Sequence, residues 1–161
     1  MLFRSGLAHH ENGDYAEAIS DYAEAIRLNP EDAFAYYNRG LAHYVNDDNA
    51  AAISDFTEAI RLNPEFVGAY NGRGDAHHEN GDYAAAISDY GEAIRLYPED
   101  AFAYYNRGLA HYVNDDNDAA ISDFTEGIQL NPELAGAYTG LGDDHHAAGH
   151  YAAASCHPTL S

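Results

Sequence analysis

Apolar and small residues recur at every third or fourth position along this chain, a spacing that predicts amphipathic helices rather than strands. Residues 65–99 show the pattern twice. The first stripe consists of Val67, Tyr70, Gly74 and His77. The second stripe consists of Tyr83, Ala86, Ile87, Tyr90, Ala93 and Ile94. Each 34-residue stretch therefore predicts two helices joined by a short turn.

The turn between the two stripes carries its own signals. Gly81 is suited to the left-handed conformation that ends a helix, and Asp82 to the N-cap of the next helix. Asp47 and Asp115 stand in the place of that glycine in the neighbouring stretches, where we expect the same turn with a small strain. Asp14 and Glu17 lie three positions apart, as a capping box requires. Each second helix should end before an Asn-Pro or Tyr-Pro pair.

The helix pair is repeated along the chain. Prolines followed by glutamate mark a period of 34 residues, at Pro30, Pro64, Pro98 and Pro132. A longer period of 68 residues lies above it, since the residues from Ala33 to Asn49 return unchanged from Ala101 to Asn117. Copied units of this length are typical of a solenoid, in which each unit buries its apolar face against its neighbours.

One family has this residue order. Small, aromatic and proline positions in the third unit resemble the tetratricopeptide repeat, at Tyr70, Gly74, Ala86, Tyr90, Ala93 and Pro98. The resemblance implies an all-α, right-handed superhelical solenoid of antiparallel helix pairs, with about 4.5 repeats and about nine helices. Residues 1–155 would form one domain, with units at approximately 1–32, 33–66, 67–100, 101–134 and 135–155, and residues 156–161 would form an irregular tail.

Two departures from the family pattern recur in register. Arginine stands directly before the recurring glycine of the first helix, where the family often has leucine, at Arg39, Arg73 and Arg107. Histidine stands where the family usually has tyrosine, at His9, His43, His77, His111 and His145. We expect these histidines to fill the tyrosine's place and to bond to their neighbours. A metal-binding role for the histidines is the alternative, which elemental analysis would test.

The charge restricts the partners. The chain has 27 acidic residues against seven arginines and no lysine, which gives a formal charge of −20. Nucleic acid and anionic membranes are disfavoured, because both are bound through basic surfaces. A basic or apolar protein partner fits better, although surplus acid also keeps a repetitive protein soluble. A single cysteine excludes an intrachain disulfide, no apolar run approaches the roughly 18 residues of a membrane helix, and no secretion signal is evident, so we expect a cytoplasmic protein.

No catalytic or metal constellation is predicted. Asp47-Asp48 and Asp115-Asp116 lack the spacing of a calcium loop and fit helix capping. Ser-Asp pairs recur on the second helices, at Ser20-Asp21, Ser54-Asp55, Ser88-Asp89 and Ser122-Asp123, and predict a solvated face. Four equivalent serines do not make the unique nucleophile of a hydrolase, and the absence of lysine excludes a Walker-A loop. We therefore predict no enzyme activity, no metal and no cofactor.

The remaining candidate site is the inner groove. In tetratricopeptide superhelices the first helix of each unit lines it, and by analogy the positions here are Phe34, Tyr37, Asn38, Leu41, Tyr44, Asn71, Asp75, His78, Phe102, Tyr105, Asn106, Leu109 and Tyr112, together with Val45, Glu79 and Val113. Aromatic rows alternate with polar, acidic rows. The lysines with which family members grip carboxylate tails are missing. Ordinary packing between adjacent helices is the alternative interpretation of the aromatic rows.

These observations predict a non-catalytic scaffold that binds a peptide or partner segment in the groove. The alternative is a structural protein that associates with itself. The sequence begins partway into a first helix and ends after one helix of a fifth unit, so like units could stack head to tail. Such stacking would give an open-ended homo-oligomer or filament, promoted by salt that screens the negative charge.

Overall fold

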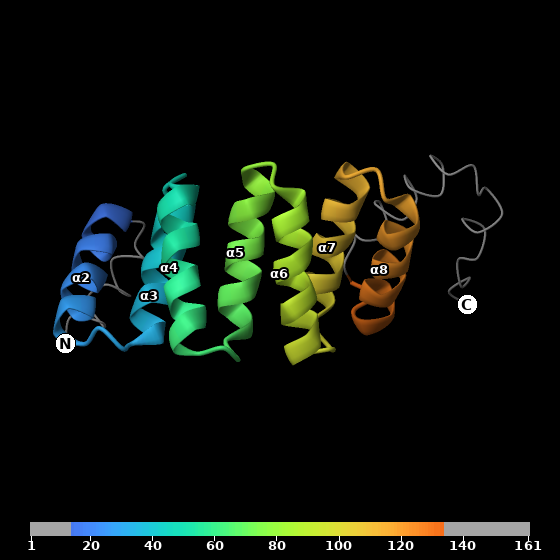
Figure 1. The fold of residues 1–161 in the computed structure, drawn as a ribbon. Helices are drawn as coiled ribbons and strands as arrows, with labels where there is room; N and C mark the ends of the chain where they lie inside the picture. Colours follow the sequence, from blue (N-terminus) through green and yellow to red (C-terminus); the bar gives the residue numbers. More distant parts are fainter. Residues whose placement is uncertain (1–13, 134–161) are drawn as a thin grey trace.

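The structure is a computed structural model that describes residues 14–133, and these residues form helices and turns without a strand (Figure 1). The seven helices are α2 (Tyr15–Leu28), α3 (Ala33–Val45), α4 (Asn49–Leu62), α5 (Val67–Glu79), α6 (Tyr83–Leu96), α7 (Ala101–Val113) and α8 (Asn117–Leu130). The predicted all-α solenoid is confirmed. The helices predicted in residues 1–13 and 134–155, and the tail at 156–161, lie outside the described residues.

The turns form as the sequence predicts. Gly81 has a φ of 76°, and Asp47 and Asp115 take the same left-handed conformation with φ values of 60° and 61°. Because a side chain makes this conformation less favourable, the two aspartate turns hold the small strain expected of them. Each second helix ends at a leucine directly before the Asn-Pro or Tyr-Pro pair.

Aspartate side chains cap most of the helices. Asp82 accepts a hydrogen bond from the backbone N–H of Ala85, as predicted. Asp48 and Asp116 do the same for α4 and α8, and Asp32 and Asp100 cap the first helices α3 and α7. The predicted capping box at Asp14 is wrong in one respect. Asp14 occupies the N-cap position of α2, but its side chain makes no capping hydrogen bond.

Within each pair, a glycine on the first helix receives an aromatic ring from the second. A Cβ atom on Gly74 would lie only 2.7 Å from Cε1 of Tyr90, and one on Gly40 would lie 2.9 Å from the ring of Phe56. Tyr90 and Phe56 are fully buried, so neither ring has space to move aside. The small residue at this position therefore permits the close crossing of the two helices.

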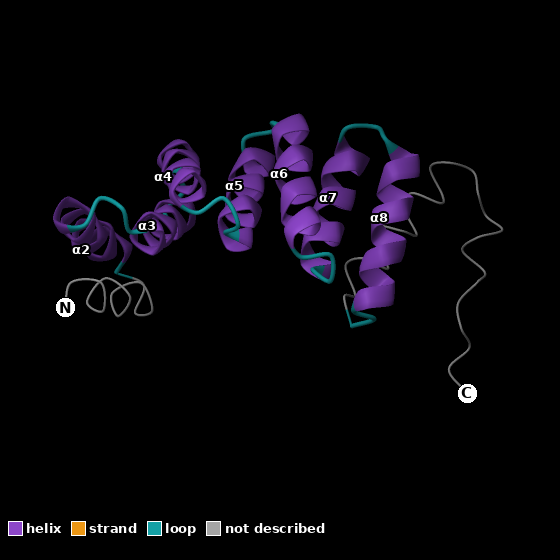
Figure 2. Cartoon of the chain, turned by 60° about the horizontal axis from the view of Figure 1, so that its bottom comes forward, coloured by secondary structure: helices purple, strands orange, loops and turns teal. Residues whose placement is uncertain are grey.

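The helix pairs stand side by side in a row (Figures 1 and 2). Successive turns lie alternately on the upper and lower side of this row in Figure 1. Each helix packs against its neighbours in sequence. The first helices α3, α5 and α7 also contact one another across units, whereas in residues 14–133 no second helix contacts another second helix. The first helices thus lie closer together than the second helices, which places α3, α5 and α7 on the inner, concave side. None of the helices in this part of the chain is long and apolar enough to cross a membrane.

Candidate functional site

Three parallel helix faces line the concave side. On α7, Phe102, Asn106 and Leu109 follow one another at spacings of four and three, so their side chains lie along one face. Phe34, Asn38 and Leu41 repeat this arrangement on α3. Between the two apolar rows, α5 presents its polar row, which consists of Asn71, Asp75, His78 and Glu79. The alternation predicted from the sequence therefore follows the order of the helices in space.

The aromatic rows are partly packed and partly free. Tyr37, Leu41 and Tyr44 are half-buried and pack against the cluster around Phe56, while Tyr105 and Leu109 pack against the cluster around Phe124. Phe34, Phe102 and Tyr112 are exposed, the two phenylalanines at 57% and 61%. Both sequence interpretations thus apply to different residues. The half-buried rings hold adjacent helices together, and the exposed rings remain available for contact.

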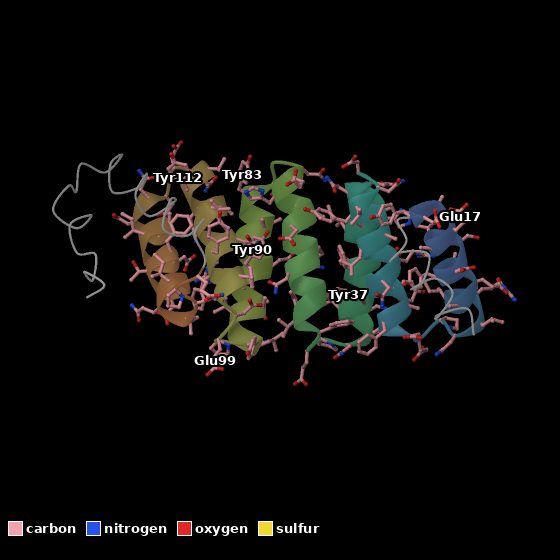
Figure 3. The ribbon with its side chains drawn as sticks, turned by 180° about the vertical axis from the view of Figure 1, so that it is seen from behind. Glu17, Tyr37, Tyr83, Tyr90, Glu99 and Tyr112 are labelled. Carbon is pink, nitrogen blue, oxygen red and sulfur yellow. The ribbon has the colours of Figure 1, made fainter. Side chains whose placement is uncertain are left out.

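Three aromatic rings meet where the unit of α3 and α4 adjoins the unit of α5 and α6. The ring of Phe66, at the N-cap of α5, lies 4.9 Å from Phe34 and 4.7 Å from Tyr37 between centroids. Asn38 donates from Nδ2 to the carbonyl of Phe34 in its own helix, and its predicted contact with a ligand stays a prediction. The N-terminal part of α3 is therefore an aromatic surface, and Figure 3 shows Tyr37 in the lower half of the row of helices, with Glu99 at its lower edge.

A cavity of about 290 Å³ opens at the centre of this concave side. Its lining comes from α3, α5, α6 and α7, and consists of Tyr44, Asp75, His78, Glu79, Tyr90, Asn106 and Leu109. Sequence analysis placed six of these residues in the groove. It did not include Tyr90, which the family pattern assigned to the core between helices. Figure 3 shows Tyr90 at mid-height of the row, between the upper position of Tyr83 and the lower position of Tyr37.

Asp75 is the polar centre of the cavity. Its Oδ1 atom accepts a hydrogen bond from the hydroxyl of Tyr90 at 2.6 Å and from Nδ2 of Asn106 at 3.1 Å. Burial raises the pKa of Asp75 above its ordinary value, while the hydrogen bonds from Tyr90 and Asn106 oppose this rise. The pKa of Tyr44 is raised by burial and by the charges of Asp75 and Glu79. The site thus holds negative charge at a half-buried position.

Two polar atoms of the same α5 face are buried without a hydrogen-bond partner among residues 14–133. They are Nε2 of His78 and Oδ1 of Asn71, whose Nδ2 donates to Asp100 at 2.8 Å. The ring of His78 meets the ring of Tyr83 edge-on, with 5.2 Å between centroids. Buried polar atoms are usually satisfied in folded proteins, so these two atoms are exceptions on the α5 face, and of the two residues His78 lines the cavity.

Sequence analysis missed a second polar system, which lies between the helices of each pair. Arg39 donates from Nε and Nη2 to both carboxylate oxygens of Asp55, at 2.8 and 2.6 Å. Equivalent pairs join Arg73 to Asp89 and Arg107 to Asp123. The guanidinium of each arginine also lies over a tyrosine ring of its own helix. The recurring separation of 16 residues between arginine and aspartate was the signal that could have revealed these pairs.

These pairs correct one prediction. The aspartates of the Ser-Asp dipeptides were expected on a solvated face, but Asp55, Asp89 and Asp123 are buried. The preceding Ser54 is exposed, as predicted. The face changes within the dipeptide because successive helical residues point about 100° apart.

The histidines that replace tyrosine stand beside the same aspartates. His43 lies 3.8 Å from Asp48 and 3.9 Å from Asp55, distances too long for a hydrogen bond. Nδ1 of His111 is buried without a hydrogen-bond partner in the described part of the chain. In the described units each of these histidines thus lies within 4 Å of two carboxylates, an ion-pair distance, without a hydrogen bond to either of them. That they fill the space of the tyrosine stays a prediction. His9 and His145 lie outside the described residues.

No group of three or more histidine, cysteine, aspartate or glutamate side chains in residues 14–133 is arranged to hold a metal ion. The nearest approach to such a group is a histidine between two carboxylates, as at His77 with Asp82 and Asp89 at 3.9 Å each. What the concave side offers is therefore a binding surface of rings, carboxylates and amides.

The geometry defines a class of protein, a helical-repeat solenoid with a lined concave face. Comparison with family models assigns the chain more narrowly. A TPR repeat model matches residues 6–47, and a tetratricopeptide repeat model matches residues 43–101 and 72–135. The chain belongs to the tetratricopeptide repeat family.

Solved structures have the same fold. MamA 41-end from Desulfovibrio magneticus RS-1 has a TM-score of 0.88 at 23% identity, over 95% of this chain and 87% of that one. YrrB, described as a TPR protein with an unusual peptide-binding site, has a TM-score of 0.83 at 20% identity, over 96% and 79%. The first TPR of Spaghetti (RPAP3), bound to the HSP90 peptide SRMEEVD, has a TM-score of 0.72 at 22% identity, over 73% and 93%. A comparison with curated protein sequences found no match.

Proposed function

We propose that this protein is a non-catalytic scaffold that holds an extended or helical segment of a protein partner against α3, α5 and α7. The observation that carries the proposal is the central cavity, which is lined by residues of three consecutive first helices, with Asp75 and His78 among them. Ligand sites are concave, with few polar groups among apolar ones, and this cavity has that character.

Family membership and two structural neighbours support the proposal. The tetratricopeptide repeat family consists largely of protein-interaction modules, and two of the similar solved structures are described by their peptides or peptide-binding sites. The acidic charge of the chain and its exposed phenylalanines favour a basic or apolar partner. Tyr37 and Tyr105 contribute to the groove mainly by holding helices together, so the exposed Phe34 and Phe102 are the better test positions.

The test selects peptides from a random library displayed on phage and measures their affinity for two variants. The groove variant carries Phe34→Ala and Phe102→Ala. The matched control carries Leu28→Ala and Tyr97→Ala, which remove side chains of 62% and 50% exposure at the ends of second helices. We expect the groove variant to bind the selected peptides with at least tenfold lower affinity than the parent protein, and the control variant to bind them with the same affinity. Peptides that bind the groove variant at full strength would exclude the concave site.

The alternative function, head-to-tail stacking into a filament, stays a prediction, because the ends that would stack lie in residues 1–13 and 134–161. Light scattering across a salt series tests it. We expect scattering to rise with salt, because screening weakens the repulsion between strongly acidic molecules. A monomer that persists at high protein and salt concentration would contradict stacking.

A further inference from the structure

Every described arginine already has a carboxylate partner. Three pairs join the helices of one unit, and three others lie on exposed second helices at a separation of three residues: Arg27 with Glu24, Arg61 with Glu58, and Arg95 with Glu92. None of the arginines lines the central cavity. In residues 14–133, therefore, the carboxylates of Asp75 and Glu79 have no arginine of this protein as a partner, and the basic side chain beside Asp75 is His78, which lowers the pKa of Asp75.

The hydrogen-bonding groups of the cavity include both donors and acceptors. Two of its donors, the Tyr90 hydroxyl and Nδ2 of Asn106, are directed at Oδ1 of Asp75, and the Tyr44 hydroxyl and the His78 imidazole are further donors in the lining. Oδ2 of Asp75 makes no hydrogen bond in the described part of the chain, and neither does the Glu79 carboxylate. Nε2 of His78 also has no hydrogen-bond partner among residues 14–133, but it is buried and so does not count as an acceptor for the ligand. A ligand that fits must therefore bring several donors.

The walls of the cavity suit a flat cation. Tyr44 comes from α3 and Leu109 from α7, whereas the ring of Tyr90 from α6 is fully buried and reaches the cavity through its hydroxyl. The half-buried ring of Tyr44 is therefore the one that this cavity presents to a ligand. Aromatic rings attract cations through their faces, and a guanidinium both stacks on rings and donates from five N–H groups in a plane. An ammonium group has three donors and a stronger hold on its water, so it matches this combination of a ring and separated acceptors less well.

We propose that the central cavity binds the guanidinium group of an arginine side chain in the partner, with Asp75 and Glu79 as its counter-ions. The proposal rests on the groove function and names the chemistry that the groove selects. The raised pKa of Asp75 agrees with it, since a half-buried carboxylate without an arginine partner gains most from a cation that arrives.

The described units contain this polar set once. Leucine takes the place of Asp75 in both neighbouring units, as Leu41 and Leu109, and valine takes the place of Glu79, as Val45 and Val113. The 68-residue period thus sets one acidic unit between two apolar ones. We accordingly expect the preferred segment to carry one arginine flanked on both sides by apolar residues.

The experiment uses the full chain and defined peptides. The probe is acetylated and amidated Gly-Ser-Leu-Ala-Arg-Ala-Leu-Ser-Gly, and its counterparts carry citrulline or lysine in place of arginine. Citrulline keeps the shape of the side chain but has no charge. NMR titration gives the dissociation constants and shows which helices respond. We expect the arginine peptide to bind at least tenfold more tightly than the citrulline peptide, and also more tightly than the lysine peptide.

Two single variants locate the effect. Asp75→Asn keeps an oxygen that accepts from Tyr90 and Asn106 but removes the charge. We therefore expect the arginine preference, which is the ratio of the affinities for the arginine and citrulline peptides, to fall close to one. Asp118→Asn removes one exposed acidic charge from the first turn of α8, and it should leave the preference intact. Unchanged circular dichroism of both variants shows that the fold is kept.

Each remaining outcome has a distinct meaning. Equal affinities for the arginine and citrulline peptides, with signals of α3, α5 and α7 shifting, would overturn the guanidinium site and leave the groove function standing. A preference that survives Asp75→Asn would overturn the location, and equal binding of lysine would overturn the choice of guanidinium. If no peptide of the series shifts those signals, both the site and the groove function are wrong for such segments.

Discussion

At the scale of single residues, Arg73 makes a hydrogen bond that the equivalent Arg107 of the next unit does not make in the described part of the chain. Nη1 of Arg73 donates to the Thr57 hydroxyl at 3.1 Å. One unit later, Arg107 faces Gly91, and a Cβ atom on Gly91 would lie at an ordinary 3.6 Å from Nη1. The space for a threonine is therefore present, but the hydroxyl is absent.

We predict that Gly91→Thr stabilises the protein by about 0.5–1 kcal/mol, through the added hydrogen bond and the loss of a helical glycine. Gly91→Val is the matched control, because valine has the same shape without the hydroxyl. Urea unfolding of the three proteins measures the difference. A valine variant as stable as the threonine variant would show that Arg107 gains nothing from the hydroxyl.

Asp75 gives a second residue-scale prediction. Its pKa is raised in the folded state, so the folded protein binds this proton more tightly than the unfolded chain. Stability from this group is therefore complete below the unfolded pKa and is lost as the pH rises through the folded pKa. We expect Asp75→Asn to be more stable than the parent protein near pH 7, with the difference disappearing toward acid pH.

Thermal unfolding at several pH values measures this effect. The other titratable groups that act on Asp75 or respond to it are Tyr37 and Tyr44 from α3, His78 and Glu79 from α5, and Tyr90 from α6. His78 and the hydrogen bonds from Tyr90 and Asn106 lower the pKa of Asp75, but burial is the larger cause, so the pKa stays raised. An Asp75→Asn variant that is less stable at neutral pH would mean that the carboxylate strengthens the fold.

At the scale of helices, the protein has two kinds of ion pair: partly buried pairs that join two helices, and exposed pairs within one helix. Arg73 and Asp89 join α5 to α6, and the side chain of Asp89 is only 6% exposed. Arg95 and Glu92 lie on the exposed face of α6. Removing one partner of a buried pair leaves an uncompensated charge, whereas an exposed pair contributes little.

We predict that Arg73→Ala costs about 3 kcal/mol of stability and Arg95→Ala less than about 1 kcal/mol. The double variant Arg73→Met, Asp89→Leu should recover most of the loss, because no buried charge remains. Urea unfolding of all three variants is the measurement. Similar losses for Arg73→Ala and Arg95→Ala would show that the pair between the helices is solvated.

The same comparison shows what a linear sequence can and cannot predict. Helix ends, turns and the left-handed Asp47 and Asp115 depend on local signals, and they were predicted correctly. The burial of Asp89 depends on Arg73 from another helix, and a hydrophilic dipeptide gives no sign of that partner. The groove rows were predictable because the family pattern identifies the first helices. The cavity around Asp75 was not, because it needs the Tyr90 hydroxyl to reach across from α6.

At the scale of the whole molecule, the charge of −20 acts on every encounter. Long-range attraction speeds the approach of an oppositely charged ligand and weakens as salt screens it. We predict that the association rate of a basic groove peptide falls about tenfold between 0.05 and 0.5 M salt, while that of an uncharged groove peptide stays within about twofold. Stopped-flow measurements test this, and equal salt dependence of the two rates would contradict steering.

The spacing of the second helices has a mechanical consequence. In the described units α3, α5 and α7 touch along the inner side, whereas α4, α6 and α8 are connected only through them. Units also join through the packing of each second helix against the next first helix, as in α4 with α5 and α6 with α7. Because the described second helices do not contact one another, we expect the row of helices to open more easily on its outer side than on its inner side. A ligand bound along α3, α5 and α7 would hold the units together and make the row of helices stiffer. Pulling on the two ends of the protein in optical tweezers would then show a shorter, less compliant molecule.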